Sequence, residues 1–190
     1  MKKILNEKGH LIARCIVFQI AMSIFGIMIN SVTVQMSNTI LLLGGIFSVL
    51  FYFSIMGAFL NEDGLKDKIK NERNSDTYDY FYGMKYVSIS YIPSLLITII
   101  HSVLTTFGLA ETVTSLLNML IRFFISGMYI GIDVYLFSSG NSVDTIAYNS
   151  FSSNGYSFII YQLFSVIICG LFYYMGMKGI NLIKSKRDNK

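Results

Sequence analysis

The chain has 190 residues, of which 53% are hydrophobic and 14% are charged, and its formal net charge is +4. Soluble domains carry about 25% charged residues, so this sequence has too few polar side chains to cover a water-soluble globule of its size. The basic residues flank apolar runs instead of forming a patch, which argues against a nucleic-acid-binding protein.

The apolar residues are gathered into five segments of about 20 residues. A helix rises about 1.5 Å per residue, so each segment is long enough to cross about 30 Å of hydrocarbon. Lipid offers no hydrogen-bond partners to the backbone, so the segments should be helical. We therefore predict an all-α polytopic membrane protein with one integral membrane domain, residues 1–190. The five membrane-embedded helices are expected over residues 11–34, 40–60, 86–109, 114–137 and 156–177.

The first segment follows four basic residues and could be read as a signal peptide. It is longer than the usual apolar region of 7–15 residues, and no A-x-A cleavage site follows it. We predict an uncleaved first span. The two cysteines, Cys15 and Cys169, have no metal-ligand spacing and are expected to behave as small apolar residues.

The second and third segments are joined by a highly charged stretch, residues 61–85, which we predict to be a cytoplasmic loop. Leu65 and Ile69 lie four residues apart, so the first half could form a short helix on the membrane surface. Asp63 and Asp67 could bind a cation, but the neighbouring lysines favour a solvated face of mixed charge, and we predict no metal site. The residues expected to dock a partner protein are Lys66, Asp67 and Lys70.

The distribution of basic residues is inconsistent with the number of apolar segments. All but one of the 15 Lys and Arg residues lie before the first span, in residues 61–85, or in the C-terminal tail, residues 178–190. Basic clusters near span ends favour the cytoplasm, so the N-terminus is expected inside. The tail is also inside only if an even number of spans follows the charged loop, yet three apolar segments follow it.

Segment 114–137 is the one in doubt, because it alone carries opposite charges, Arg122 and Asp133. Such a charge at the bilayer centre costs about 2.5–3.5 kcal/mol on insertion scales. The length of the segment favours a full span, which is the preferred interpretation. The charge bias favours a re-entrant or tilted segment, which would leave four full spans.

Polar residues recur at steps of three and four along three segments, which places them on common helix faces. Arg122 and Asp133 would be about 16 Å apart along one helix, so each needs a partner elsewhere, and His101 is a candidate for Asp133. Helix packing is the favoured role of these seams, and a solute path is the alternative. The residues of the predicted polar seam are Gln19, Asn30, His101, Asn118, Arg122 and Asp133.

Gly127 and Gly131 form a GxxxG pattern on the side of the predicted helix away from Arg122, which favours close helix packing. The sequence has no HExxH, GxSxG, P-loop or dinucleotide-binding motif. We therefore predict a protein without enzymatic activity and without a cofactor.

Short motifs resemble those of small multi-pass membrane proteins from low-GC Gram-positive bacteria. They are EDGLKD at residues 62–67, GMK at 83–85, Ile92-Pro93 and the region 176–179, and they cover about a third of the chain. No activity is established for that group, so the resemblance implies a membrane protein and no functional residue. The chain is also similar in size to substrate-binding subunits of energy-coupling-factor vitamin transporters, but it lacks their sixth span and AxxxA contacts.

The sequence thus predicts a multi-pass protein of the bacterial cytoplasmic membrane, in contact with the lipid bilayer and without a nucleic-acid partner. The preferred function is a transport-related subunit that acts with a membrane or cytoplasmic protein partner. The alternative is a non-transport membrane protein, such as a self-immunity, envelope-stress or structural factor.

Overall fold

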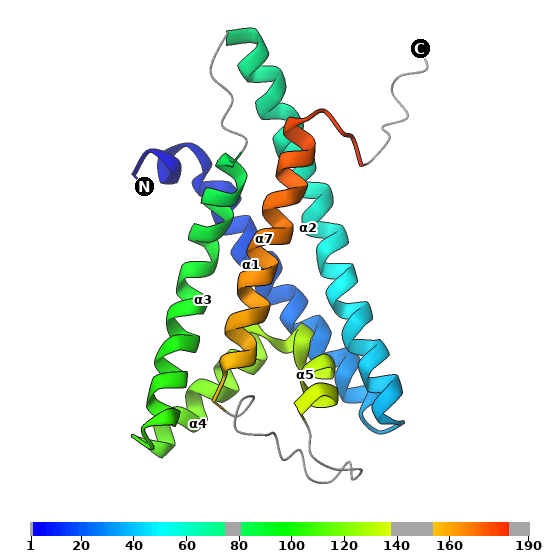
Figure 1. The fold of residues 1–190 in the computed structure, drawn as a ribbon, viewed down its shortest axis with the longest axis vertical. Coiled ribbons are helices and arrows are strands. Elements are labelled where there is room, and N and C mark those ends of the chain that lie inside the picture. Colours follow the sequence, from blue (N-terminus) through cyan, green and yellow to red (C-terminus); the bar gives the residue numbers. More distant parts are fainter. Residues whose placement is uncertain (1, 75–80, 138–153, 183–190) are drawn as a thin grey trace.

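The computed structural model describes residues 2–74, 81–137 and 154–182 of the chain. Regular structure in these residues is entirely helical, which confirms the predicted all-α class. Four long helices form the bundle shown in Figure 1. They are α1 (Lys2–Thr33), α2 (Asn38–Asn74), α3 (Tyr82–Thr106) and α7 (Tyr156–Met177).

Each long helix is apolar over a length that can cross a bilayer. The bundle is also apolar on its outer surface, where Phe47, Leu96 and Leu163 are each at least half exposed. Polar side chains such as Gln19 and Gln162 are buried instead. A surface of this kind is stable against hydrocarbon and not against water, so the fold is that of a membrane protein.

The fifth apolar segment is not a single straight helix. It consists of α4 (Glu111–Leu120), a π-helical turn η1 (Ile121–Ile125), a 3-10 turn η2 (Gly127–Tyr129) and α5 (Ile130–Phe137). Its two arms are bent by 83° at Ser126. The prediction of one two-faced helix over residues 114–137 is therefore wrong in geometry, because the chain turns sharply at its centre.

The bent segment enters and leaves the bundle at the same end (Figure 1). α4 begins shortly after α3 ends, and it rises towards the interior. α5 returns, so that Val134 lines a groove with Val34 and Leu41, beside the turn that joins α1 to α2. Both ends of the segment thus lie at one end of the bundle, as in the re-entrant alternative, and the described residues contain four helices that can span a membrane, or five if the bent pair counts as one broken span.

Two glycines hold the bent segment close to its neighbours. A Cβ atom on Gly127 would collide with the backbone oxygen of Ser23 in α1. A Cβ atom on Gly131 would lie 3.0 Å from the Cα atom of Gly45 in α2. The predicted close packing at Gly127 and Gly131 is present, but Gly127 packs against α1 alone, whereas Gly131 packs against both α1 and α2, so the two glycines do not form one GxxxG face.

Helix α2 continues far beyond its apolar half. It has 37 residues and is about 55 Å long, which exceeds the thickness of the hydrocarbon core. Its last turns project above the bundle in Figure 1. The prediction that residues 61–85 form a loop is therefore wrong up to Asn74 and again from Tyr82, where α3 begins, and residues 75–80 lie outside the described part of the chain.

The start of α1, the end of α2, the start of α3 and the end of α7 all lie at one end of the bundle (Figure 1). We call it the basic end. The opposite end, which we call the far end, holds the α1–α2 turn, the start of α4 and the end of α5. The described residues that make the basic end positive are Lys8, Lys66, Lys68, Lys70, Arg73, Lys85 and Lys178. Of the basic tail, residues 183–190 are not described.

Candidate functional site

A chain of hydrogen bonds crosses the buried centre of the bundle and links three long helices. The side-chain amide of Gln19 in α1 donates to the hydroxyl of Ser94 in α3 at 3.3 Å. Ser94 lies 3.1 Å from the side-chain oxygen of Gln162 in α7, and the Gln162 amide donates to Thr98 at 3.0 Å. All four side chains are buried. Gln19, a residue of the predicted seam, therefore faces inward as expected.

Tyrosines fill much of the interior around this chain. The hydroxyls of Tyr52 and Tyr91 are hydrogen-bonded to each other, and the hydroxyl of Tyr129 is hydrogen-bonded to Ser165. Tyr129 also stacks on Tyr161, with ring centroids 4.9 Å apart. Tyrosine can fill space and still satisfy its hydroxyl, which suits an interior that joins apolar and polar groups.

The break in the bent segment is held by polar side chains of α1. The hydroxyl of Ser23 accepts a hydrogen bond from the backbone N–H of Gly127 at 2.7 Å. Asn30 donates its side-chain amide to the backbone oxygen of Gly127 at 3.2 Å. A non-helical backbone at this depth needs partners from protein because lipid provides none. Asn30, predicted as a seam residue, thus stabilises the break.

Three further seam residues lie on the bent segment. Arg122 is half-buried, and its Nε atom donates to the side-chain oxygen of Asn118 one turn earlier, at 2.9 Å. Asp133 is 1% exposed and lies within electrostatic reach of the Tyr161 hydroxyl. Because the chain turns between Arg122 and Asp133, the two do not share a helix face as the sequence suggested.

His101 does not pair with Asp133 as predicted. Its ring is 2% exposed, and the Nε2 atom lies 3.4 Å from the hydroxyl of Thr105 on the same helix. His101 lies instead against the start of α7, where a Cβ atom on Gly155 would be 2.9 Å from its Nδ1 atom.

A cluster of charged and hydroxyl groups joins all four long helices at the basic end. The ammonium group of Lys8 in α1 lies 3.0 Å from the carboxylate of Asp63 and 2.8 Å from that of Asp67, both in α2. Tyr86 of α3 donates to Asp63 at 3.0 Å, and Tyr173 of α7 donates to Asp67 at 2.9 Å. We call these five residues the four-helix ion cluster.

The four-helix ion cluster was only partly visible in the sequence. The spacing of Asp63 and Asp67 suggested a cation site, and the cation beside them is the ammonium group of Lys8 from 55 residues away. Asp67 therefore faces inward, away from the surface on which its predicted docking role would place it. Lys66 and Lys70 do lie on the surface, where Lys66 pairs with Glu62 at 2.7 Å.

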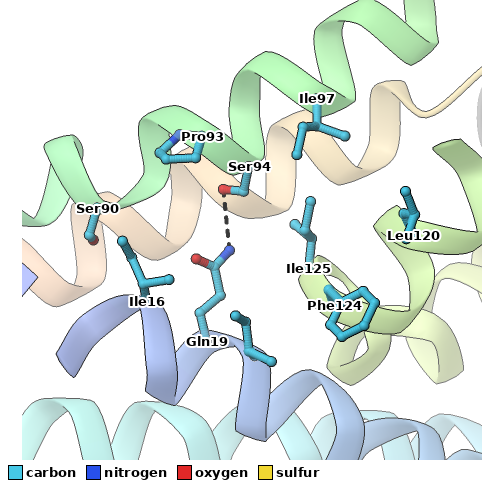
Figure 2. A pocket seen from close by; sticks show the side chains of 10 residues that line it. Ile16, Gln19, Ser90, Pro93, Ser94, Ile97, Leu120, Phe124 and Ile125 are labelled. Carbon is cyan, nitrogen blue, oxygen red and sulfur yellow. Dashed lines mark hydrogen bonds between the residues drawn. The ribbon is translucent and has the colours of Figure 1, made fainter. Parts of the chain in front are cut away.

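A cavity of about 270 Å³ lies beside the hydrogen-bond chain, between α1, α3 and η1 (Figure 2). Most of its wall is apolar, and Gln19 and Ser94 form its polar side. No group of three or more His, Cys, Asp or Glu side chains that could hold a metal ion occurs within residues 2–74, 81–137 and 154–182. The described polar groups thus suit hydrogen bonding and ion pairing.

Comparison with protein-family models, with curated proteins and with solved structures found no match for this chain. The resemblance to small multi-pass proteins of Gram-positive bacteria stays a prediction. The function is therefore inferred from the geometry of the buried polar groups and of the bent segment.

Proposed function

We propose that the protein is a transport-related subunit of the bacterial cytoplasmic membrane that works with partner proteins. The observation that carries the proposal is the bent segment, whose break at Ser126 lies in the interior of the bundle. Many transporters build their solute sites from discontinuous helices near the middle of the bilayer. A break of this kind costs backbone hydrogen bonds, and in this protein Ser23 and Asn30 supply replacements.

The charge distribution supports an orientation for this subunit. Basic clusters next to spans favour the cytoplasmic side, so we place the basic end in the cytoplasm, together with the N-terminus. With the bent segment counted as re-entrant, the end of α2 and the end of α7 are on the same side. The inconsistency between the basic clusters and the number of apolar segments is thereby removed.

The projecting part of α2 is the surface we assign to a cytoplasmic partner. Lys66, Lys70 and Arg73 are exposed there, and the side chain of Ile69 is 63% exposed among them. An apolar residue within a ring of charges suits a protein partner, since the apolar contact gives affinity and the charges give orientation. The partner would supply the energy for transport.

The proposal is tested by isolating the tagged protein from its native membranes in a mild detergent. We expect a stoichiometric partner that hydrolyses nucleotides or translocates ions. The double variant K66E/K70E should lose this partner, because both changed side chains are exposed and outside the four-helix ion cluster. E111K, at the far end, is the matched control and should retain it. A purified protein without any partner, or one that keeps its partner in K66E/K70E, would contradict the proposal.

A second candidate is a protective or structural membrane protein, and one observation favours it. The side chains of Gln162 and Thr98 form a hydrogen bond between α7 and α3, as expected of residues that stabilise helix packing. The variants R122Q and D133N separate the two functions. In a transport subunit, each variant should fail to rescue a deletion strain even though the variant protein is present at its normal level. In a structural protein the rescue should fall only as far as thermal stability falls.

A further inference from the structure

The cavity of Figure 2 is large enough for a small organic molecule. Its volume is about 270 Å³, whereas an apolar cavity of about 150 Å³ accepts benzene, so there is space for roughly ten non-hydrogen atoms. No charged side chain lines it. Its lining residues include Gln19, Ile20, Ser94, Ile97, Phe124 and Ile125.

The cavity opens sideways, towards the surrounding lipid. Pro93, Leu120 and Phe124 lie on its rim and are exposed, with Leu120 and Phe124 each 41% exposed. Gln19 and Ser94 lie on the opposite, buried side. A molecule dissolved in the hydrocarbon can therefore enter between α3 and η1 without passing through water.

The hydrogen bonds around the cavity fix the orientation of the Gln19 amide. The amide of Gln162 donates to Thr98, whose own hydroxyl donates to the backbone oxygen of Ser94. The side-chain oxygen of Gln162 must then accept, and the Ser94 proton goes to it or to the backbone oxygen of Tyr91. Ser94 therefore accepts from Gln19, and its hydroxyl has no proton left for a ligand.

This network leaves part of the Gln19 amide without a partner. A side-chain amide offers one oxygen and two N–H groups, and only one N–H is used by Ser94. Within the described residues, neither the oxygen nor the second N–H makes a hydrogen bond, although Gln19 is only 4% exposed. Figure 2 shows the oxygen turned away from Ser94. The Ser90 hydroxyl is already bonded to the backbone oxygen of Val87, at 2.6 Å.

We propose that this cavity binds a small, uncharged, apolar molecule that carries one hydroxyl group and enters from the bilayer. A hydroxyl both donates and accepts, so it can satisfy the oxygen and the second N–H of Gln19. The acyl chain of a phospholipid would fill the same space but leave the amide unpaired, which is costly in apolar surroundings. The inference deepens the proposed function by naming a class of cargo. It depends on the proposed function only in assuming that the protein lies in a lipid bilayer.

The proposal is tested with a diazirine-bearing octanol as a photolabel. The purified full chain is placed in nanodiscs of phosphatidylcholine and phosphatidylglycerol, and labelled residues are identified by mass spectrometry. We expect labelling of Ile97, Phe124 and Ile125, blocked by octanol and much less by octane. Gln19→Leu should reduce labelling about fivefold at subsaturating probe, as expected for loss of a neutral hydrogen bond.

A second pair of variants tests the site without removing a polar group. Ile20→Phe should fill the cavity and abolish labelling, whereas Leu96→Phe adds an aromatic ring on the lipid-facing side of α3 and should leave labelling unchanged. The proposal is overturned if octane competes as well as octanol, which indicates an acyl-chain cavity, or if labelling spreads evenly over lipid-facing residues. The photolabelling experiment requires no partner protein. A negative result would therefore contradict the cavity proposal alone, whereas failure to isolate a partner would contradict the proposed function.

Discussion

The ammonium group of Lys8 lies between two carboxylates of α2. Each carboxylate also accepts a hydrogen bond from a tyrosine hydroxyl of another helix. The side chains of Lys8, Asp63 and Asp67 are each less than one-fifth exposed. Two carboxylates one turn apart would repel each other strongly in such surroundings. Lys8 therefore stabilises the contact of α1 with α2, and Tyr86 and Tyr173 bring α3 and α7 to the same point.

Removing this ammonium group should destabilise the bundle. We expect Lys8→Met to lower the free energy of unfolding by about 3 kcal/mol, because it leaves two buried carboxylates without their cation. The double variant K8M/D63N should recover part of that loss, since it also removes one negative charge. Thermal unfolding in detergent measures both. Equal stability of Lys8→Met and the unchanged protein would show that the ion pairs contribute nothing.

Gly26 is the second residue on which the packing depends. A Cβ atom there would lie 2.6 Å from the backbone nitrogen and 2.8 Å from the backbone oxygen of the opposing η2 segment, at Met128 and Gly127. Because these are backbone atoms, a rotamer change cannot relieve the collision. We expect Gly26→Ala to cost about 1–3 kcal/mol in the free energy of unfolding.

Gly9→Ala is the matched control for this substitution. Gly9 lies in the same helix, and nothing is within 4 Å of its added Cβ atom. Alanine favours a helix over glycine by up to about 1 kcal/mol, so Gly9→Ala should be neutral or stabilising. If the two variants lose the same stability in a thermal scan, the close contact of α1 with η2 is not what the glycine preserves.

At the scale of helices, the four long spans could be predicted well and the bent segment could not. Hydropathy placed the last span at residues 156–177, and α7 covers Tyr156–Met177. The turn at Ser126 lies within a stretch as apolar as the others, so a window average conceals it. Its causes are contacts with Ser23 and Asn30, about 100 residues away in the sequence. The conflict with the basic clusters, together with the opposite charges of Arg122 and Asp133, indicated that this segment is unusual.

The course of the bent segment can be tested with cysteines at its two ends. Glu111→Cys and Leu136→Cys should both react with a membrane-impermeant maleimide on intact cells, because both ends lie at the far end of the bundle. Lys70→Cys, at the basic end, should react only after permeabilisation. The natural Cys15 and Cys169 are buried and should contribute little. Labelling of Leu136→Cys only after permeabilisation would mean that residues 111–137 cross the membrane.

For the molecule as a whole, the amino-acid composition predicted the outward-facing apolar surface. The buried polar sites depend on long-range contacts, which composition does not predict. A low charged fraction was enough to predict a membrane protein, and an interior of polar seams was expected from helical spacing. The partners within those seams depended on how the helices cross. Asp67 illustrates this, because three neighbouring lysines predicted a solvated environment for it, whereas Lys8 of α1 and Tyr173 of α7 contact it in the structure.

The packing of the helices also brings the start of α1 and the end of α7 to the same end of the bundle. Lys8 near the start of α1 contacts Asp63 of α2, and Asn61 of α2 donates to the backbone oxygen of Ile180, just after α7. The N- and C-terminal ends of the bundle are thus within one cluster of contacts. Under the proposed topology α1, α2, α3 and α7 cross the membrane and the bent segment returns, which makes the number of crossings even.

We therefore expect tags at the N-terminus and at the C-terminus to behave alike towards an added protease. Both should be protected on intact cells, since the basic end is proposed to face the cytoplasm, and both should be cut after permeabilisation. If both tags were accessible on intact cells, the protein would have the opposite orientation in the membrane with the same fold. One protected and one accessible tag would require an odd number of crossings, and the bent segment would then have to be a broken span.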